Sequence, residues 1–288
     1  MQPLDSPILL TNSLTHKSVI EQSATCLPFL KWAGGKRWLS SYLREAVGIV
    51  EGQYIEPFLG SGASYFSLRP HRAVLSDSNK ELIATYRGIQ LYAQAVSKHL
   101  SEHHSKHRKE YYYQLRDCTP VGFAAKAARF IYLNRTCWNG LYRVNLNGIF
   151  NVPIGTKTAV TLATDDFKAT SALLKSAILC NCDFEHSVNR AQRGDVLFCD
   201  PPYTVRHNNN GFVKYNEHLF VWQDQVRLRD ALLRAQSRGA RIFVTNADHE
   251  SIRELYKTHF DITCMTRFSS IGGAKAQRGK YAELLIIG

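Results

Sequence analysis

The feature that most constrains the fold of this chain is a regular alternation between short apolar runs and longer stretches with helical spacing. The apolar runs have the length of buried strands and cover residues 53–58, 73–76, 177–181, 196–199, 241–245 and 282–287. Residues 38–47 and 223–238, which flank such runs, space their apolar residues three and four apart, as amphipathic helices do. The alternation predicts an α/β fold with a doubly wound, Rossmann-like parallel sheet and helices on both faces.

The middle of the chain interrupts this alternation with a segment that is mostly helical and strongly basic. Residues 98–143 contain nine lysine and arginine residues against three acidic ones, so half of the net charge of +12 lies there. Residues 141–152 then alternate in polarity around Asn147-Gly148, a dipeptide typical of hairpin turns. We therefore expect a small, mainly helical domain that carries a β-hairpin and faces a polyanion.

These patterns divide the chain into three parts. Residues 1–27 are polar and aperiodic, which predicts a flexible N-terminal tail. Residues 28–80 and 166–288 hold the strands and form the predicted sheet domain, and residues 81–165 form the basic insert. A length of 288 residues accommodates one such sheet and one small insert, with little left for a further domain.

Several classes of protein are disfavoured by composition. No apolar run approaches the roughly 20 residues of a membrane-spanning helix, and the N-terminus lacks the basic cluster and apolar core of a signal peptide. The seven cysteines are an odd number, and Cys180 and Cys182 have no second pair at zinc-ligand spacing. We expect a cytoplasmic protein with free thiols, no metal and no membrane partner.

A group of histidines lies in the basic segment, at His99, His103, His104 and His107. Such a group either binds a metal or forms a solvated basic helix face, and we favour the solvated face.

The first motif with chemical content is Phe58-Leu-Gly60-Ser-Gly62, at the end of a predicted strand. A glycine-rich turn between a strand and a helix lets the backbone approach a nucleotide-like cofactor closely. Asp77 ends the next predicted strand, where a carboxylate accepts hydrogen bonds from ribose hydroxyls. Tyr65 stands where a pyrophosphate-binding turn has its third glycine, which suits a cofactor without phosphates. A plain tight turn and a helix N-cap at Asp77 would give the same pattern.

The second motif, Asp200-Pro201-Pro202-Tyr203, directly follows the predicted strand 196–199. Open α/β sheets have their active sites at this carboxyl end of the strands. The two prolines fix the backbone and lack N–H donors, so the motif offers a carboxylate, rigid carbonyl acceptors and an aromatic ring. A rigid turn after a strand is the alternative interpretation.

This set of groups suits a planar amine such as the exocyclic amine of adenine, whose lone pair is delocalised into the ring. Hydrogen bonds from the amine to Asp200 and to the Pro201 carbonyl favour a tetrahedral nitrogen, which exposes the lone pair for in-line attack on an activated methyl group. The sulfonium of S-adenosylmethionine provides such a methyl group without a metal. Tyr203 would hold the adenine ring by stacking.

Three boxes in this order resemble the Dam family of DNA adenine-N6 methyltransferases (D12 class, alpha group). They are Phe29-Leu-Lys-Trp-Ala-Gly-Gly-Lys36, Phe58-x-Gly60-x-Gly62 and Asp200-Pro-Pro-Tyr203. Residues 134–135, 139–141, 145, 150–153 and 155 match the DNA-binding region of the same family. The resemblance covers about residues 28–288 and implies a methyltransferase sheet, S-adenosylmethionine as cofactor and methylation of adenine in double-stranded DNA.

The resemblance also implies the residues of the cofactor site. Trp32 and Lys36 would line the pocket near the methionine end of the cofactor, and Asp77 would bind the ribose. Asp183 would hydrogen-bond the adenine of the cofactor and Phe184 would pack on it. The glycine loop would contribute Phe58, Gly60, Ser61 and Gly62. Without the resemblance, Lys36 reads as a surface lysine and Trp32 as a core aromatic residue.

The implied catalytic residues are Asp200, Pro201, Pro202 and Tyr203, with Asp200 also next to the cofactor. Because Asp200 cannot reach a base inside a duplex, the target adenine must flip out of the helix. Trp138 would fill or brace the gap that the flipped base leaves. Trp138 and Tyr142 replace residues seen in other members of the family.

Sequence reading is expected from the hairpin, and 5′-GATC is the expected site. Arg143 would grip the O6 and N7 atoms of a guanine, Leu141 would touch a thymine methyl group, and Asn139 would bond a base edge or a phosphate. Lys31 resembles the position that reads the first guanine. For Leu141 and Asn139, a purely structural role in the hairpin is an equal alternative.

Arg135 and Asn145 in the insert are expected to contact DNA because they belong to the match with the family's DNA-binding region, and such binding would associate the cytoplasmic protein with the nucleoid. Contacts to phosphates, which position the duplex without reading it, are expected from Lys98, Lys106, Arg108, Lys109 and Arg116. The same role is expected of a basic loop before the last predicted strand, with Arg267, Lys275 and Arg278. An unpaired surface loop is the alternative for the last three.

Four functions remain open at this point. The favoured one is methylation of adenine in GATC by an enzyme that is monomeric on DNA and needs no obligate protein partner. The same chemistry on a longer related site such as GATATC is the first alternative. An RNA or protein amide methyltransferase and a DNA-binding protein without catalysis are the others; the basic insert argues against the former, and the intact Asp77, Asp200 and Tyr203 argue against the latter.

Overall fold

The computed structural model describes residues 26–145, 148–205, 220–268 and 280–288. Its centre is a seven-stranded sheet with the order β3-β2-β1-β4-β5-β7-β6. The strands are β1 (Tyr54–Glu56), β2 (Ala73–Asp77), β3 (Ala177–Asn181), β4 (Val196–Cys199), β5 (Arg241–Ala247), β6 (Asp261–Phe268) and β7 (Lys280–Ile287). The first five are parallel, and β7 runs antiparallel to both β5 and β6. The predicted α/β fold is therefore confirmed.

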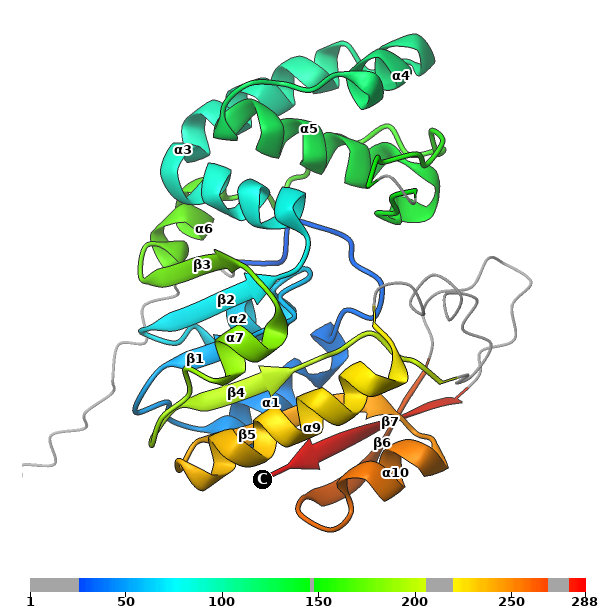
Figure 1. Cartoon of the computed structure of the whole chain (residues 1–288). Helices are drawn as coiled ribbons and strands as arrows, with labels where there is room; N and C mark the ends of the chain where they lie inside the picture. Colours follow the sequence, from blue (N-terminus) through cyan, green and yellow to red (C-terminus); the bar gives the residue numbers. More distant parts are fainter. Residues whose placement is uncertain (1–25, 146–147, 206–219, 269–279) are drawn as a thin grey trace, which may run out of the picture.

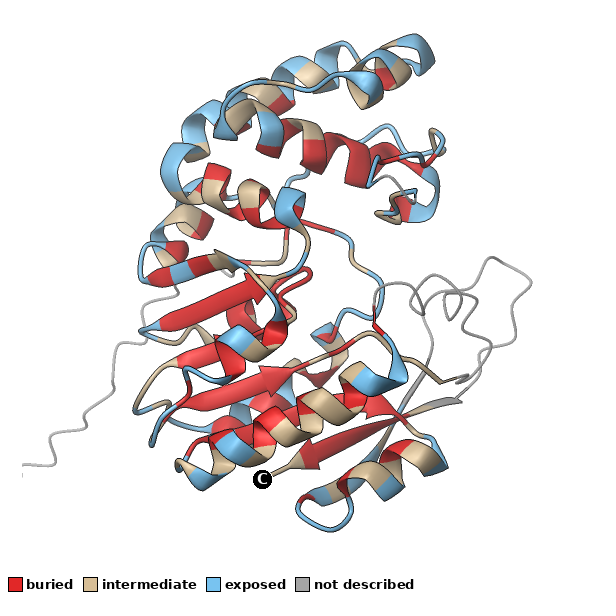
Figure 2. Cartoon of the chain, viewed as in Figure 1, coloured by how far each residue is buried: buried red, intermediate tan, exposed pale blue. Residues whose placement is uncertain are grey.

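Successive residues of each strand face opposite sides of the sheet and enter two separate cores. Tyr54 of β1 and Phe198 of β4 belong to one core, whereas the neighbouring Ile55 and Leu197 belong to the other. The first core takes in α1 (Ser40–Val47) and α2 (Ala63–Leu68), and the second takes in α7 (Phe184–Val188), α9 (Trp222–Ser237) and α10 (Glu250–Tyr256). Figure 2 shows the buried strands between these helices. Burial on both faces explains why the parallel strands read as continuous apolar runs.

The basic insert is a group of helices that lies beyond the β3 edge of the sheet (Figure 1). It is made of α3 (Lys80–Ser105), α4 (Lys109–Asp117), α5 (Phe123–Thr136) and the 3₁₀ turn η2 (Trp138–Gly140), and α6 (Phe167–Leu174) leads back to β3. A second 3₁₀ turn, η1 (Arg37–Leu39), precedes α1. α3 and α5 pack closely, because a Cβ atom on Gly88 would lie 2.6 Å from the Cβ atom of Ala127.

Helix α3 crosses the predicted boundary between residues 80 and 81. Its first half carries Leu82 and Tyr86 into the core near the sheet, and its second half carries Val96 and Leu100 among the helices of the insert. The helix departs from helical geometry at Tyr92, where φ is −138° and ψ is 39°. The sheet and the insert therefore share one helix, and the domain division at residue 81 stays a prediction.

The predicted tail and hairpin differ in detail from the structure. Residues 1–25 lie outside the described residues, but Cys26 is buried and its Sγ atom lies 3.2 Å from Thr170 Oγ1. In place of a long hairpin, the 137–155 loop doubles back through two isolated antiparallel bridges, Cys137 with Ile154 and Val144 with Phe150. Asn147 lies outside the described residues.

The expectation of a solvated histidine face is wrong for two of the four histidines. His103 Nδ1 lies 2.7 Å from the Tyr111 hydroxyl and His107 Nδ1 lies 2.8 Å from the Tyr132 hydroxyl, so both pack between helices of the insert. Burial lowers the pKa of His103 to about 4, which keeps its ring neutral.

The described residues offer neither a membrane-spanning helix nor a cluster of metal ligands. No helix among them is long and apolar enough to cross a membrane, and they contain no cluster of three or more His, Cys, Asp or Glu side chains that could hold a metal ion.

Candidate active site

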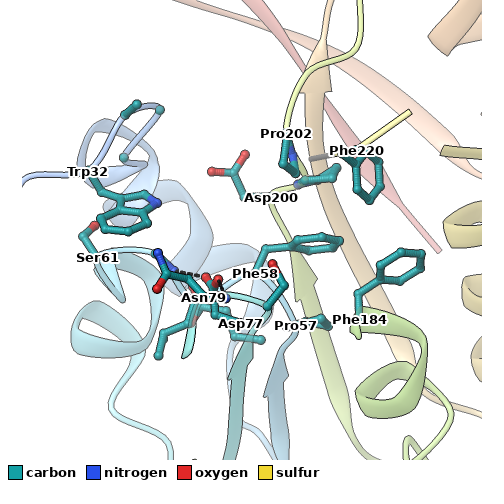
Figure 3. Close-up of a pocket in the computed structure, with 18 of the residues that line it drawn as sticks. Trp32, Pro57, Phe58, Ser61, Asp77, Asn79, Phe184, Asp200, Pro202 and Phe220 are labelled. Atoms are coloured by element: carbon teal, nitrogen blue, oxygen red, sulfur yellow. Dashed lines mark hydrogen bonds between the residues drawn. The ribbon is translucent and has the colours of Figure 1, made fainter. Parts of the chain in front are cut away.

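The carboxyl ends of β1, β2 and β4 open into a cavity of about 690 Å³ (Figure 3). Trp32 and Ser61 lie on one side of it, Phe58, Phe184 and Phe220 lie on the other, and the Asp200 carboxylate projects between them. The predicted residues that line the cavity are Trp32, Lys36, Phe58, Gly60, Ser61, Asp77, Leu141, Asp183, Phe184, Asp200, Pro201, Pro202 and Tyr203. One fold therefore brings together side chains from three distant boxes of the sequence.

The glycine loop has the close approach that its composition predicts. Gly60 and Gly62 have φ values of +47° and +65°, a left-handed conformation that side chains rarely adopt. A Cβ atom on Gly60 would lie 2.6 Å from Cδ1 of Trp32, so only glycine lets the indole lie against the loop. Gly62 does not line the cavity and instead forms the N-cap of α2.

Asp77 ends β2 at the floor of the cavity. Its carboxylate accepts hydrogen bonds from the backbone N–H groups of Gly60, at 3.1 Å, and Asn79, at 2.9 Å. Burial raises the pKa of Asp77 to about 6, and these two bonds limit the rise. The group is therefore largely ionised at neutral pH and can accept further hydrogen bonds.

Asp200 is held through one of its two oxygens. Thr245 Oγ1 donates to Oδ1 at 2.7 Å, and Lys36 Nζ lies 2.8 Å from the same atom. Among the described residues, Oδ2 has no hydrogen-bond partner, so it is available to a ligand in the cavity. Burial raises the pKa of Asp200, while the Lys36 ammonium and the Thr245 hydroxyl oppose the rise.

Glu283 is a member of this site that the sequence reasoning missed. Its side chain is buried on β7, its Oε2 atom accepts a hydrogen bond from the Tyr203 hydroxyl at 3.0 Å, and Lys36 Nζ lies 3.4 Å from the same atom. Burial alone would lower the pKa of Lys36, but the Asp200 and Glu283 carboxylates raise it well above its usual range. The half-buried Asp200 and buried Glu283 carboxylates thus flank one buried ammonium, which leaves a net negative charge when all three are ionised.

Three phenylalanines form the opposite wall. The rings of Phe58 and Phe184 are stacked with centroids 5.4 Å apart, and Phe220 lies 5.7 Å and 5.6 Å from them. The sequence reasoning did not identify Phe220, which belongs to no motif. Arg227 covers Phe184 at 4.4 Å and pairs with the Asp183 carboxylate at 2.5 Å.

Most of the predicted DNA contacts that the structure describes are exposed near the mouth of the cavity. Lys31, Trp138, Asn139, Arg143 and Asn145 are exposed, and Leu141 is half-buried. Asn139 has a φ of +58°, which is uncommon for a residue other than glycine and marks a constrained turn. Arg267 lies on β6, but the structure does not describe its side chain. Lys275 and Arg278 lie outside the described residues.

Arg135 is a correction to the predicted DNA contacts. It is 4% exposed, and both of its terminal nitrogens donate to the Asp165 carboxylate at 2.6 Å. It also donates to the carbonyl oxygens of Phe29 and Val160. A buried, bidentate arginine of this kind stabilises the insert and is not free to contact DNA.

Comparison with known proteins agrees with this geometry. Residues 32–271 match the model of the D12 class N6 adenine-specific DNA methyltransferases. The chain belongs to this family. It is 35% identical to the Type II methyltransferase M1.LlaDCHI of Lactococcus lactis subsp. cremoris, over 90% of this chain and 94% of that protein.

Two further relatives are about as similar to this chain. The Type II methyltransferase M.MjaIII of Methanocaldococcus jannaschii is 34% identical, over 90% of this chain and 98% of that protein. A DNA adenine methylase of Haemophilus influenzae is 30% identical, over 90% of this chain and 93% of that protein. The chain is therefore a DNA adenine methyltransferase, and its family is a class of methyltransferases that depend on S-adenosylmethionine.

Proposed function

We propose that this enzyme transfers the methyl group of S-adenosylmethionine to the exocyclic N6 amine of an adenine that has flipped out of double-stranded DNA. The observation that carries the proposal is the arrangement of Asp200, whose Oδ1 atom is held by Lys36 and Thr245 while Oδ2 is available to the cavity. Oδ2 and the Pro201 carbonyl accept hydrogen bonds from the amine and turn its lone pair toward the methyl group. Pro202 keeps this backbone rigid.

The cavity fits the cofactor by the chemistry of its lining. Bound S-adenosylmethionine supplies an electrophilic methyl group on a positively charged sulfur. The carboxylates of Asp200 and Glu283 outnumber the ammonium of Lys36, so the cavity favours a cationic ligand. Asp77 accepts the ribose hydroxyls, and the rings on the opposite wall pack on the adenine of the cofactor.

Each predicted cofactor residue has a part in this arrangement. Trp32 and Ser61 close the side next to the glycine loop, where Gly60 allows close approach and Gly62 fixes the start of α2. Phe58 and Phe184 contribute the aromatic wall. Asp183 is already bonded to the Glu185 N–H and paired with Arg227, so a bond to the cofactor would use its remaining acceptor capacity.

Tyr203 fixes the position of the target base. Its hydroxyl is held by Glu283, and Lys36 Nζ lies 5.2 Å from its ring centroid. A ring held at both its edge and its face offers a fixed stacking surface to an adenine.

The DNA contacts follow from the exposed side chains around the 137–155 loop. Trp138, which is 54% exposed, fills the gap left by the flipped adenine. Arg143 and Lys31 read guanines, Leu141 contacts a thymine methyl group, and Asn139 and Asn145 bond base edges or phosphates. We propose 5′-GATC as the site and a monomer as the form that acts on it.

The test is a methylation map combined with a transfer assay. The enzyme is expressed in a host without adenine methylation, the methylated positions are sequenced, and transfer from labelled S-adenosylmethionine is measured on matched duplexes that differ by one base pair. Methylation of adenine at every GATC supports the proposal. Methylation only within a longer site would replace GATC and keep the chemistry, whereas tight DNA binding without transfer to any duplex would refute the proposed chemistry.

A further inference from the structure

Tyr142 lies between the proposed readers Leu141 and Arg143, but its half-buried side chain packs into the protein. Its ring stacks on Phe130 of α5 at 4.6 Å and on Trp32 at 5.8 Å, with interplanar angles of 29° and 18°. It also contacts Phe150, on the returning arm of the 137–155 loop, at 5.4 Å. Tyr142 therefore lies at the centre of an aromatic column that reaches from the loop to the cofactor box.

The hydroxyl of Tyr142 forms a second connection. It donates a hydrogen bond to Glu81 Oε2 at 2.5 Å, and the other oxygen of Glu81 lies 3.6 Å from Arg129 Nη1. Burial and the neighbouring Glu81 carboxylate raise the pKa of Tyr142, so the hydroxyl keeps its proton. Glu81 is thereby placed between the base-reading loop and the insert helix α5.

Both anchors of Tyr142 belong to segments that line the cofactor cavity. Trp32 lies against Gly60 of the glycine loop, and Glu81 follows closely on Asn79, whose N–H bonds Asp77. Elsewhere, the 137–155 loop is held mainly by the two isolated bridges and by Asn134, which bonds the backbone of Lys31 on both sides and the Gly140 carbonyl. The Tyr112 hydroxyl also donates to the Val152 carbonyl, at 2.8 Å. Tyr142, which itself lines the cavity, connects the loop to Trp32 and Glu81 of the cavity wall.

We propose that Tyr142 is a positioning residue that couples occupancy of the cofactor cavity to recognition of the DNA site. A cofactor that packs against Trp32 and bonds Asp77 immobilises the two segments that Tyr142 contacts. Tyr142 then restricts the motion of its neighbours Leu141 and Arg143. The loop then loses less conformational freedom when it binds its site, so the enzyme binds that site more tightly. By linkage, site-specific DNA tightens cofactor binding by the same factor. This inference rests on the proposed function and deepens it.

The experiment measures binding of a fluorescent duplex that carries the mapped site, and of one altered by one base pair, with and without saturating S-adenosylhomocysteine. For the unaltered enzyme, we expect this non-reactive probe to raise affinity for the matched duplex by about 10-fold, within the range usual for coupled sites. Affinity for the altered duplex should change by less than about 2-fold, because phosphate contacts do not need an ordered loop tip.

Tyr142→Ala should reduce the coupling to about 2-fold or less while the protein keeps its thermal melting profile and its affinity for the altered duplex. Tyr142→Phe removes only the hydroxyl contact, whereas Glu81→Gln weakens it and also removes the charge paired with Arg129. Both should give a partial loss of coupling, and the double variant should lose less than the two single losses combined. Tyr42→Ala, on an exposed position of α1, is the matched control and should leave the coupling unchanged.

Coupling of unaltered size in all three variants would overturn the proposal, as would a complete absence of coupling in the unaltered enzyme. Should Tyr142→Ala fail to fold, Tyr142→Phe and Glu81→Gln decide the question by the same measurement, the ratio of duplex affinities with and without S-adenosylhomocysteine. Methyl transfer is assayed in parallel, so failure of the proposed function, seen as no transfer to any duplex, is distinguished from failure of the coupling alone.

Discussion

The site around Asp200 and the 137–155 loop are both parts of one active face, but they are built in opposite ways. Around Asp200, the side chains of Lys36 and Glu283 are almost fully buried and contact the functional group directly. In the loop, Trp138, Asn139 and Arg143 are exposed, and short bridges and the half-buried Tyr142 hold the backbone. In the proposed mechanism, the chemistry depends on fixed charges, whereas recognition depends on exposed groups of the loop.

The largest effect is expected at the fixed end of this comparison, for Asp200→Ala. Removal of the acceptor should lower kcat by about 10³-fold, the size typical for loss of one preorganised hydrogen bond at a reacting group. DNA affinity should stay within about 2-fold, because Asp200 contacts only the flipped adenine in the proposed complex, while the contacts to phosphates and to the other bases lie elsewhere. Glu283 still neutralises Lys36 in the variant, so we expect it to fold.

Single-turnover methyl transfer and duplex binding are the measurements for Asp200→Ala, with Asp261→Ala on the exposed edge strand as the control. Turnover within 10-fold of the unaltered enzyme would contradict the assigned role.

Arg143→Ala probes the exposed end. Loss of a bidentate contact to guanine should reduce discrimination at one base pair by roughly 1–3 kcal/mol, with kcat on the matched duplex much less affected than specificity. The measurement is kcat/KM on duplexes substituted at each position of the site. Lys168→Ala, on the exposed surface of α6, is a matched removal of positive charge. An unchanged preference at every position would reject Arg143 as a reader.

Glu283→Gln tests whether the buried charge matters beyond its shape. Glutamine can still accept the Tyr203 hydroxyl bond, but the loss of a neighbouring negative charge lowers the pKa of Asp200 and weakens it as an acceptor. We expect kcat to fall by about 10-fold, the size of one hydrogen bond to a charged group, with KM for the duplex nearly unchanged.

Tyr203→Phe is the companion measurement for Glu283→Gln. If the two residues act as a unit, the double variant should be less impaired than the product of the single effects. Glu254→Gln, which changes an exposed acid on α10, should have no effect. Equal kcat in Glu283→Gln and the unaltered enzyme would mean that the charge of Glu283 has only a structural role.

The sequence predicted the parallel strands closely because they are buried on both faces and therefore continuously apolar. Strand β6 was missed because polar residues such as Thr263 and Thr266 interrupt it on an exposed edge of the sheet. The motifs at Asp77 and Asp200 were recognisable because each acid ends a buried strand, where the topology of the sheet determines its location.

Long-range contacts explain what could not be predicted. Glu283 meets Tyr203 only because β7 inserts beside β5, an arrangement that no local pattern in either segment encodes. Arg135 was misread because a match to the family's DNA-binding region does not distinguish an arginine paired with Asp165 in the core from one that faces solvent. Phe220 looks like any core phenylalanine until Phe58 and Phe184 are seen beside it.

Helix α3 has a practical consequence for the design of enzymes with exchanged recognition segments. Its first half supports the floor of the cavity, since the Tyr86 hydroxyl donates to the Gly60 carbonyl at 3.1 Å, and its second half supports the insert. A graft that joins two relatives at the start of this helix would transplant part of the donor's cofactor floor with the insert. A junction at the bend at Tyr92, matched by one before α6, would leave the glycine loop on its own scaffold.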